Sequence, residues 1–451
     1  MSDRTVAVAV IAGLLVAKLL LASQVGLLAD EAYYRCWADA PALGYYDQPP
    51  MIAWLLTPLA SSSSTVLLRL PALVCGALAA LVLLPFATVP TRWAAAWACP
   101  ALFGLTFAAT PDAPLLFGWC LALAGALAGG PWWLAAGLGA GIAFLSKYTG
   151  LAVLPLAIAA AGPTDWRTPW PWAGLGLFAV LIAPNITWNA THDGVSFTFQ
   201  LHEGLVHANA PGLGGALTLA LDQLGVVGPV LVLAAAAGVV FAPRPWDRPT
   251  RVLVATSLGT LLVFVIASLF APPEAHWPAP AWIGLLLLLA RSGPRVSRAA
   301  EVGLTLAAAS TAFLALAALG VMWSPPAFRD RFAEGALLVD GMRSWALPAA
   351  SEGPRDPTPV FAERYQEVAF LRTAGLPAWR MATCGRPDEF TRADSPPREE
   401  ALFVRPRRSG PLTCIGDDWE IVDGPHDLDG IDAEGRRVAR WQVFTVRPVV
   451  P

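Results

Sequence analysis

The chain has 451 residues, of which 56% are hydrophobic and 14% charged, and its formal net charge is −3. Because about a quarter of the residues of a soluble globular protein are charged, this composition excludes an ordinary soluble enzyme and predicts a polytopic membrane protein. The small net charge, without a basic aromatic patch, gives no indication of a nucleic-acid partner.

The apolar runs before residue 325 are rich in Leu, Ala, Val and Gly and do not alternate polar with apolar residues. They predict an all-α membrane domain rather than a barrel, since a helix satisfies its own backbone polar groups in lipid. The first run is long and has no small-residue cleavage site, so we interpret it as a retained helix rather than a signal peptide. About eleven transmembrane helices are expected, at Val6–Leu28, Thr65–Val89, Trp93–Ala109, Ala113–Ala128, Trp132–Leu145, Gly150–Ala161, Pro171–Ile186, Gly214–Phe241, Val252–Ala271, Pro278–Ala290 and Val302–Met322.

Basic residues fall almost entirely in alternate loops of this pattern, the loops on the same side as the N-terminus. By the positive-inside rule the N-terminus is cytoplasmic, and an odd number of spans places the C-terminus on the external face. The opposite loops gather acidic residues at the membrane boundary, namely Asp30, Glu31, Asp39, Asp47, Asp112, Asp193, Glu203 and Glu274.

The composition changes after the sequence "MWSPP", and the remainder is rich in charge, Pro and turn residues. We therefore predict a transmembrane domain over residues 1–324 and a small soluble α/β domain on the external face over residues 325–451. Within the tail, "TPVFAERYQEVAFLRTAGLPAW" predicts a strand followed by a helix, "GRRVARWQVFTVRP" a strand, and "GRPDEFTRADSPPREEA" an exposed loop. Cys384 and Cys414 are able to pair if the tail is external, although their spacing does not decide it.

The first external loop, residues 29–64, contains two features. "DEAYYRCW" predicts a short amphipathic helix at the membrane interface, in which Asp30 and Glu31 either cap the first turn or form part of a functional site. In "GYYDQPPMIAW", Pro49 and Pro50 end any preceding helix, so Asp47 is held at a break between two segments. Carboxylates on such a loop suit either base catalysis or cation binding.

Four motifs in chain order, "DEAYY", "GYYDQPP", "TPDAPLLF" and "FLSKYTG", make the chain resemble the bacterial branch of the protein O-mannosyltransferase-like glycosyltransferases. This group has the GT-C fold and includes the lipid A aminoarabinose transferase. The resemblance covers most of the membrane region and is weak to absent over the tail. It implies a multi-pass enzyme of the bacterial inner membrane whose partners are a polyprenyl-phosphate sugar donor, membrane lipids and an envelope acceptor, which is a lipid, a glycan or a protein. It also implies inverting transfer on the external face.

The resemblance assigns catalytic roles to acidic residues. Asp30 matches the Asp of the family's "DE" motif and is the expected general base, with Glu31 beside it. Asp112 matches an acidic residue near the reaction centre and is expected to orient sugar hydroxyls, although an Asp at this position also caps the next helix. Gln48 replaces the lysine that contacts the carrier phosphate in the aminoarabinose transferase, so the phosphate of the donor needs another cation.

Lys147 is the expected substitute, because the resemblance places it near the phosphate, although snorkelling to the boundary is the alternative explanation for a lysine at a span end. The other expected substrate-binding residues are Tyr148, Tyr45, Tyr46, Gln48, His276 and Glu274. A divalent metal is a candidate cofactor, because in the aminoarabinose transferase an acidic residue of the first loop and a histidine of a later loop hold one. Asp47 with His202 or His207 would reproduce that arrangement, although no ligand-like spacing supports it.

Two other classes of function compete with this interpretation. A lipid or glycolipid flippase or transporter would have internal repeats and ionisable groups near the bilayer midplane. No repeat is evident, and Lys18 and Arg69 lie near span ends, where snorkelling accounts for them. A non-catalytic sensor whose tail binds a glycan is the third class, and it predicts that Asp30 is dispensable.

Overall fold

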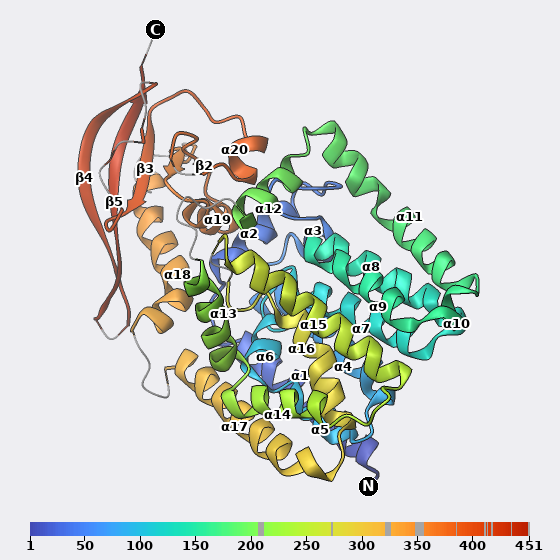
Figure 1. Cartoon of the computed structure of the whole chain (residues 1–451). Coiled ribbons are helices and arrows are strands. Elements are labelled where there is room, and N and C mark those ends of the chain that lie inside the picture. Colours follow the sequence, from blue (N-terminus) through green and yellow to red (C-terminus); the bar gives the residue numbers. More distant parts are fainter. Residues whose placement is uncertain are drawn as a thin grey trace. The chain divides into compact units, whose positions relative to one another are not determined.

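The computed structural model describes residues 1–205, 212–271, 274–320, 326–347, 356–384, 386–409, 412, 414–415, 418–433 and 435–449 (Figure 1). The chain forms two compact units. One, here called the helical unit, comprises Met1–Ser23, Ala42–Leu55 and Arg69–Ala315. The other, here called the mixed unit, comprises Gln24–Pro41, Leu56–Leu68 and Leu316–Pro451. The predicted first external loop, residues 29–64, is therefore divided between the two units, whereas the predicted domain boundary at residue 324 stays a prediction.

The helical unit is built from apolar helices joined by short turns and 3-10 segments. Its α-helices are α1 (Asp3–Ala22), α3 (Met51–Leu56), α4 (Thr65–Leu83), α5 (Pro90–Ala96), α6 (Pro100–Leu105), α7 (Asp112–Ala128), α8 (Trp133–Ser146), α9 (Val153–Ala161), α10 (Pro163–Trp166), α11 (Trp170–Thr191), α12 (Val195–Leu205), α13 (Leu213–Val226), α14 (Pro229–Val240), α15 (Arg248–Ser268), α16 (Ala279–Arg291) and α17 (Pro294–Ala318), and its 3-10 segments are η2 (Leu84–Phe86), η3 (Gly130–Trp132) and η4 (Tyr148–Ala152).

Several of these helices are long and apolar enough to cross a membrane, as the composition predicts. Within the described residues there are five such helices, or up to six when α13 and α14 count as one bent span. The helices Asp112–Ala128, Tyr148–Ala161 and Ala279–Arg291 are apolar but shorter. The chain is a multi-pass membrane protein with a mostly helical fold, and the predicted number of eleven spans stays a prediction.

Two predicted spans are not continuous helices. The run Trp93–Ala109 is split into α5 and α6, and Pro100 is the first residue of the second helix. The run Gly214–Phe241 is split into α13 and α14, which are bent by 104° at a break containing Gly228 with φ +103°. Proline lacks an amide hydrogen and glycine adopts positive φ readily, so the backbone turns where hydropathy alone shows an uninterrupted apolar run.

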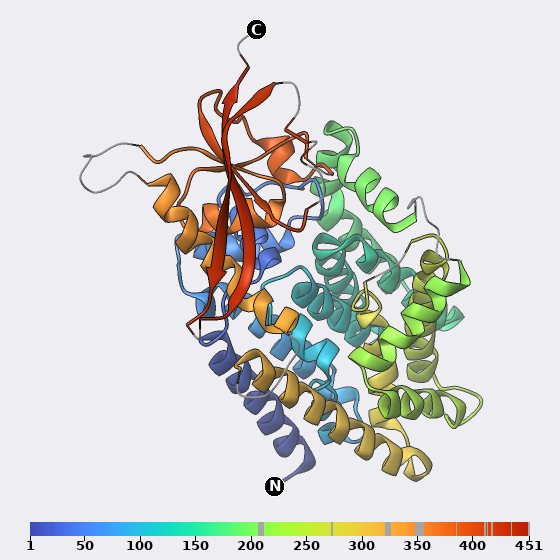
Figure 2. The same cartoon turned by 90° about the vertical axis from the view of Figure 1, so that its left-hand side faces the viewer.

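The mixed unit combines helices with a five-stranded sheet (Figure 2). Its elements are α2 (Ala29–Trp37), η1 (Thr57–Leu59), α18 (Pro326–Ala346), β1 (Val360–Ala362), α19 (Tyr365–Thr373), β2 (Ala378–Arg380), α20 (Glu389–Ala393), β3 (Ala401–Pro406), β4 (Trp419–Ile431) and β5 (Arg437–Pro448). The strand order is β2-β1-β3-β5-β4, with β1 parallel to β2 and β3 and the remaining pairs antiparallel. The strand, helix and strand predicted in the tail are confirmed as β1, α19 and β5.

Aromatic side chains form the core of this sheet. Phe361 lies opposite Phe403, and Phe403 lies opposite Phe444 in the next strand. The side chains of Phe361 and Phe403 are fully buried, and that of Phe444 is almost so. Such cross-strand pairs supply the apolar area that a small domain needs, and they fix the register of the strands.

The structure differs from the sequence-based prediction in the segment 386–401. The prediction of an exposed loop is wrong for α20, whose Asp388 side chain accepts a hydrogen bond from the backbone N–H of Thr391. Asp388 also forms a buried ion pair with Arg380 at 3.0 Å, and Phe390 is buried. The charge density of this segment indicated exposure, but its charges are partly neutralised inside the unit.

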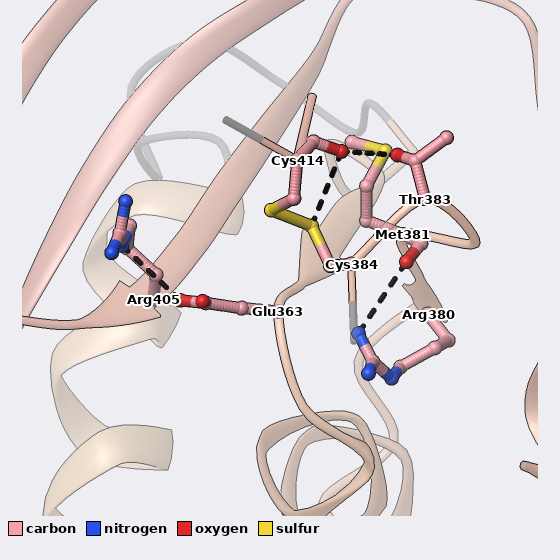
Figure 3. Close-up of a disulfide and its surroundings, with 7 residues drawn as sticks. All are labelled: Glu363, Arg380, Met381, Thr383, Cys384, Arg405 and Cys414. Atoms are coloured by element: carbon pink, nitrogen blue, oxygen red, sulfur yellow. Dashed lines mark hydrogen bonds and ion pairs between the residues drawn. A yellow bond between two sulfur atoms is a disulfide. The ribbon is translucent and has the colours of Figure 1, made fainter. Parts of the chain in front are cut away.

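Cys384 and Cys414 form a disulfide with a Cα–Cα distance of 4.7 Å (Figure 3). The Thr383 hydroxyl donates a hydrogen bond to the carbonyl oxygen of Cys414 beside it. The bond closes a stretch of chain in which β3 is the only regular strand among the described residues. It thereby connects the turn after β2 to the segment before β4.

Candidate active site

Three of the predicted site residues of the helical unit lie together, although they are far apart in the sequence. The Lys147 ammonium donates a hydrogen bond to Oδ1 of Asp112 at 2.6 Å, and Nε2 of His276 lies 4.0 Å from Oδ2 of the same carboxylate. Thr110 donates to Oδ2 at 3.3 Å. Asp112 is buried, whereas about a third of the His276 side chain is exposed. The group is thus a carboxylate that is hydrogen-bonded to the Lys147 ammonium and has the His276 imidazole nearby.

The packing of α7 against α8 brings Asp112 and Lys147 together. Asp112 is the first residue of α7, and Lys147 directly follows α8 in an extended conformation. A Cβ at Gly118 would lie 2.5 Å from the backbone nitrogen of Ala143, and a Cβ at Gly139 would lie 2.4 Å from that of Ala122. Glycine therefore permits an approach that any side chain would prevent, as is common between membrane helices.

The turn that carries His276 is held by a different set of contacts. The side chain of Gln223 on α13 donates a hydrogen bond to the carbonyl oxygen of Ala275 at 2.9 Å. The indole of Trp282 on α16 donates to the Gln223 side-chain oxygen, also at 2.9 Å. These contacts hold the turn before α16. Glu274, predicted to bind substrate, is exposed in the same turn.

This charge arrangement bears on Lys147, for which the sequence left open snorkelling to the membrane boundary or a role near the donor phosphate. Lys147 is not an isolated cation at the membrane boundary. Its side chain is largely buried and pairs with a buried carboxylate. A buried ion pair of this kind is neutral as a whole, and removing either partner leaves an uncompensated charge. An anionic ligand would share the ammonium with Asp112.

A network of neutral polar groups surrounds Tyr148. Its hydroxyl lies 2.8 Å from the Ser196 hydroxyl and accepts a hydrogen bond from the Asn189 amide at 3.2 Å. Asn185 and Asn189 are buried, and the side-chain oxygen of each has no hydrogen-bond partner among the described residues. Sequence reasoning missed Ser196 and the two asparagines, although two asparagines four residues apart on an apolar helix are a signal that could have identified Asn185 and Asn189.

The segment 42–55 packs against α11 and α12. The Asn185 amide donates to the carbonyl oxygen of Leu43 at 2.8 Å, and the Gln200 amide donates to the carbonyl oxygen of Asp47 at 2.5 Å. Tyr45 is buried, and its hydroxyl accepts a hydrogen bond from the backbone N–H of Ala42. The carbonyl oxygen of the half-buried Gln48 accepts from the backbone of Tyr45.

The predicted metal ligands are only partly described. Tyr46, next to Asp47, packs on Phe199 of α12 with ring centroids 5.2 Å apart, and His202 on the same helix is exposed. His207 lies outside the described residues. Among the described residues no three His, Cys, Asp or Glu side chains form a group that could hold a metal ion. The predicted site stays a prediction.

The remaining acidic pair belongs to the mixed unit, on α2. Asp30 is exposed, and its Oδ1 accepts a hydrogen bond from the Tyr365 hydroxyl at 2.9 Å. Glu31 is buried, and its carboxylate accepts from the backbone N–H of Leu28 at 2.9 Å, which is the capping role. Of the two carboxylates, Asp30 is therefore the one accessible to a substrate.

The predicted short helix is confirmed as α2, and its aromatic face packs on protein. Tyr33 and Trp37 are buried, and the ring centroids of Tyr33 and Tyr365 lie 4.6 Å apart. Cys36 lies near Ala369 and Thr373 of α19, and burial raises the pKa of its thiol to about 11. A thiol of this kind is not reactive near neutral pH.

Known proteins resemble both the sequence and the fold. A family model described as dolichyl-phosphate-mannose-protein mannosyltransferase matches residues 47–188, which include Asp47, Asp112, Lys147 and Tyr148 but not Asp30. The lipid A galacturonosyltransferase RgtD of Rhizobium johnstonii is 29% identical over 293 residues. That match covers 57% of this chain and 59% of the relative, so it spans less than two thirds of the relative's length.

Two crystal structures of ArnT from Cupriavidus metallidurans share the fold. The apo structure has a TM-score of 0.62 and covers 97% of each chain, at 15% sequence identity. The structure bound to undecaprenyl phosphate has a TM-score of 0.63 and covers 98% of each chain, also at 15% identity. The sequence resemblance to GT-C glycosyltransferases is therefore confirmed, and the likeness in fold includes the C-terminal region, where the motifs gave no signal.

Proposed function

We propose that this protein, which has the GT-C fold of ArnT, is an integral membrane glycosyltransferase of the bacterial inner membrane. It takes a sugar from a polyprenyl-phosphate donor and transfers it to an envelope lipid, glycan or protein. The observation that carries the proposal is the buried Lys147–Asp112 pair with His276 beside it. Lys147 and Asp112 lie in the segment that the mannosyltransferase family model matches, and a buried lysine is suited to binding a phosphate.

In the proposed reaction the Asp30 carboxylate accepts the proton of an acceptor hydroxyl. The acceptor oxygen then attacks the anomeric carbon of the sugar from the side opposite the carrier. The bond between that carbon and the phosphate oxygen breaks, and the phosphate leaves with the electron pair, so the configuration inverts. A phosphate leaving group needs little acid assistance, and one general base suffices.

In this proposal the helical unit supplies the positive charge that stabilises the leaving phosphate. Lys147 stabilises the negative charge that develops on the leaving phosphate, and His276 adds a second donor on the same side of the cluster. Asp112 keeps the ammonium in place before the donor binds and orients sugar hydroxyls. Tyr148, Tyr46, Gln48 and Glu274 are the remaining proposed substrate contacts, whereas Tyr45 and Glu31 are already used in holding the backbone.

Two observations support a reaction on the external face. The disulfide between Cys384 and Cys414 is typical of an oxidising compartment. In addition, Arg248, Arg251 and Arg291, which lie in predicted cytoplasmic loops, approach carbonyl oxygens at the ends of other helices. We therefore propose that the N-terminus is cytoplasmic, and that residues 325–451 lie outside, as the charge pattern predicts.

The test compares two exposed aspartates at opposite ends of α2. We expect Asp30→Asn to abolish sugar transfer in membranes supplied with a polyprenyl-phosphate sugar, because an amide cannot accept the proton. Asp39→Asn is the matched control, since Asp39 is exposed and pairs with Arg35 just past the C-terminal end of the helix. It should retain transfer.

The same pair of variants is read out in cells by mass spectrometry of envelope lipids, glycans and proteins. A deletion strain should lack one sugar mass in a single fraction, and the Asp39→Asn gene should restore it while the Asp30→Asn gene does not. Full restoration by Asp30→Asn at equal expression would remove Asp30 from the mechanism. An unchanged envelope in the deletion strain would contradict the proposed function itself.

A further inference from the structure

We infer that Tyr365 is a positioning residue for Asp30, so that the C-terminal part of the chain takes part in the chemistry. This inference rests on the proposed function, in which Asp30 is the general base. The Tyr365 hydroxyl donates a hydrogen bond to Oδ1 of Asp30 at 2.9 Å, although the two residues are 335 positions apart in the sequence. Both belong to the mixed unit.

The helix that carries Asp30 is fixed to the C-terminal elements by an aromatic cluster. Tyr33 packs against Tyr365 of α19 at 4.6 Å and against Phe390 of α20 at 5.1 Å between ring centroids. The backbone N–H of Glu389 donates to the Tyr33 hydroxyl at 2.9 Å. These contacts bury Tyr33 almost completely, so α2 has a defined position on α19 and α20.

Tyr365 is well placed to act on Asp30 and not merely to pack. It is the first residue of α19, directly after Arg364, which is the N-cap residue in an extended conformation. Its ring packs on Tyr33, which fixes the direction of the hydroxyl. The hydrogen bond then fixes Oδ1 of Asp30, and the second carboxylate oxygen is left to accept the proton of an acceptor hydroxyl.

A donor on one carboxylate oxygen holds the side chain in one rotamer, which lowers the cost of aligning base and acceptor. A hydrogen bond to a charged group is one of the stronger ones, and its loss is expected to change the rate by about 10-fold or more.

Other charged groups of the packed elements are engaged in pairs of their own. Arg35 pairs with Asp39 on α2, Glu31 accepts the Leu28 amide, Glu367 pairs with Arg364 on α19, and Glu389 pairs with Arg392 on α20. The electrostatic surroundings of Asp30 therefore include these groups in addition to the Tyr365 hydroxyl. Replacing Tyr365 by phenylalanine changes the hydroxyl alone and leaves every one of these charges in place.

The experiment compares Tyr365→Phe with Tyr33→Phe in the full-length protein. Each variant keeps its ring and loses one hydroxyl from the same aromatic cluster; the Tyr365 hydroxyl donates to Asp30, whereas the Tyr33 hydroxyl accepts from the backbone of Glu389. We expect Tyr365→Phe to lower kcat about 10-fold with little change in KM for the lipid-linked donor. Tyr33→Phe should lower the thermal unfolding temperature but keep the kcat and KM of the wild type.

The outcomes separate the positioning role from the proposed function. If Asp30→Asn abolishes transfer while Tyr365→Phe keeps the wild-type kcat, the positioning role is overturned and the glycosyltransferase assignment stands. Equal changes of kcat in both tyrosine variants would likewise overturn it, because a shared effect reports loss of packing. If the wild type transfers no sugar and Asp30→Asn leaves the envelope unchanged, the function itself fails.

Discussion

Lys147 and Lys18 are both buried lysines of the helical unit, but their partners differ. Lys147 pairs with the Asp112 carboxylate, whereas Lys18 donates to the Thr106 hydroxyl at 2.5 Å and lies over the ring of Phe103. A carboxylate partner keeps an ammonium charged in a low-dielectric site, and a charged ammonium is what a phosphate requires. Of these two residues, only Lys147 has the surroundings expected of a phosphate ligand.

This difference leads to a prediction about the positive charge of Lys147. Lys147→Gln should reduce sugar transfer by about 100-fold, the usual scale for removing one group that stabilises a developing negative charge. Lys147→Arg keeps the charge and should retain part of the activity. The measurement is the initial rate of transfer from a polyprenyl-phosphate donor at saturating acceptor.

Lys18→Gln is the matched control for this prediction, because it also removes a buried ammonium from the helical unit. It should leave the rate within a few-fold of the wild type once the amount of folded protein is equalised by thermal unfolding. If Lys18→Gln lowers the rate as much as Lys147→Gln does, the loss reflects general destabilisation and not phosphate binding.

At the residue scale, the sequence did not indicate the surroundings of individual charged side chains. Lys18 and Arg69 were expected to snorkel to the membrane boundary, but both are buried, and Arg69 donates to the carbonyl oxygen of Ala22 at 3.2 Å. Asn189, which stands in a glycosylation-like "NAT" sequence, is buried beside Tyr148. Hydropathy describes the average depth of a segment, whereas the partner of a single polar group depends on another helix.

At the scale of elements, the close contact between α7 and α8 determines whether Asp112 can reach Lys147. The contact depends on glycines, because a Cβ at Gly139 would lie 2.4 Å from the backbone nitrogen of Ala122 and 2.5 Å from the carbonyl oxygen of Gly118. Backbone atoms cannot rotate out of the way as a flexible side chain can. The distance between the two helices is therefore sensitive to a single methyl group.

We predict that Gly139→Ala destabilises the protein by about 1–3 kcal/mol, the usual cost of overpacking. It should also lower transfer activity, since separating the helices separates the ends that carry Asp112 and Lys147. The measurements are thermal unfolding in detergent and the transfer rate of the fraction that remains folded.

Gly176→Ala provides the matched control. Gly176 lies inside α11, and a Cβ there would have open space around it. Alanine favours a helix over glycine by up to about 1 kcal/mol, so this variant should be neutral or slightly more stable. Equal destabilisation by Gly139→Ala and Gly176→Ala would show that close helix packing is not the cause.

At the scale of the whole molecule, the chain places α2, which carries the proposed base Asp30, in the same compact unit as its C-terminal sheet. Asp30 belongs to the segment Gln24–Pro41, which groups with Leu316–Pro451 and not with the apolar helices that follow it in the sequence. The N-terminal and C-terminal parts of the chain therefore have to fold together before Asp30 reaches Tyr365. Truncating the tail would remove a hydrogen-bond donor of the proposed base.

The proposed orientation in the membrane gives a prediction at this scale. A cysteine placed by Glu400→Cys, in the exposed segment before β3, should react with a membrane-impermeant maleimide in intact cells. A cysteine placed by Arg167→Cys, in the exposed turn before α11, should react only after the membrane is permeabilised. The opposite labelling pattern would invert the topology and exclude a reaction on the external face.

The sequence by itself determined that the chain crosses a membrane repeatedly, that its acidic groups and motifs resemble those of GT-C glycosyltransferases, and that the tail contains a strand, a helix and a further strand. These properties follow from local composition and periodicity, which each segment carries independently. The prediction of Asp30 and Lys147 as site residues also came from short motifs.

Only the tertiary structure decided which of these residues meet. Lys147 contacts Asp112 because glycines allow the close approach of α7 and α8. Asp30 contacts Tyr365 because aromatic rings hold α2 against α19. The breaks of two apolar runs and the pairing of Cys384 with Cys414 were likewise settled there. Such contacts join residues far apart in the chain, and they depend on packing geometry that no local pattern contains.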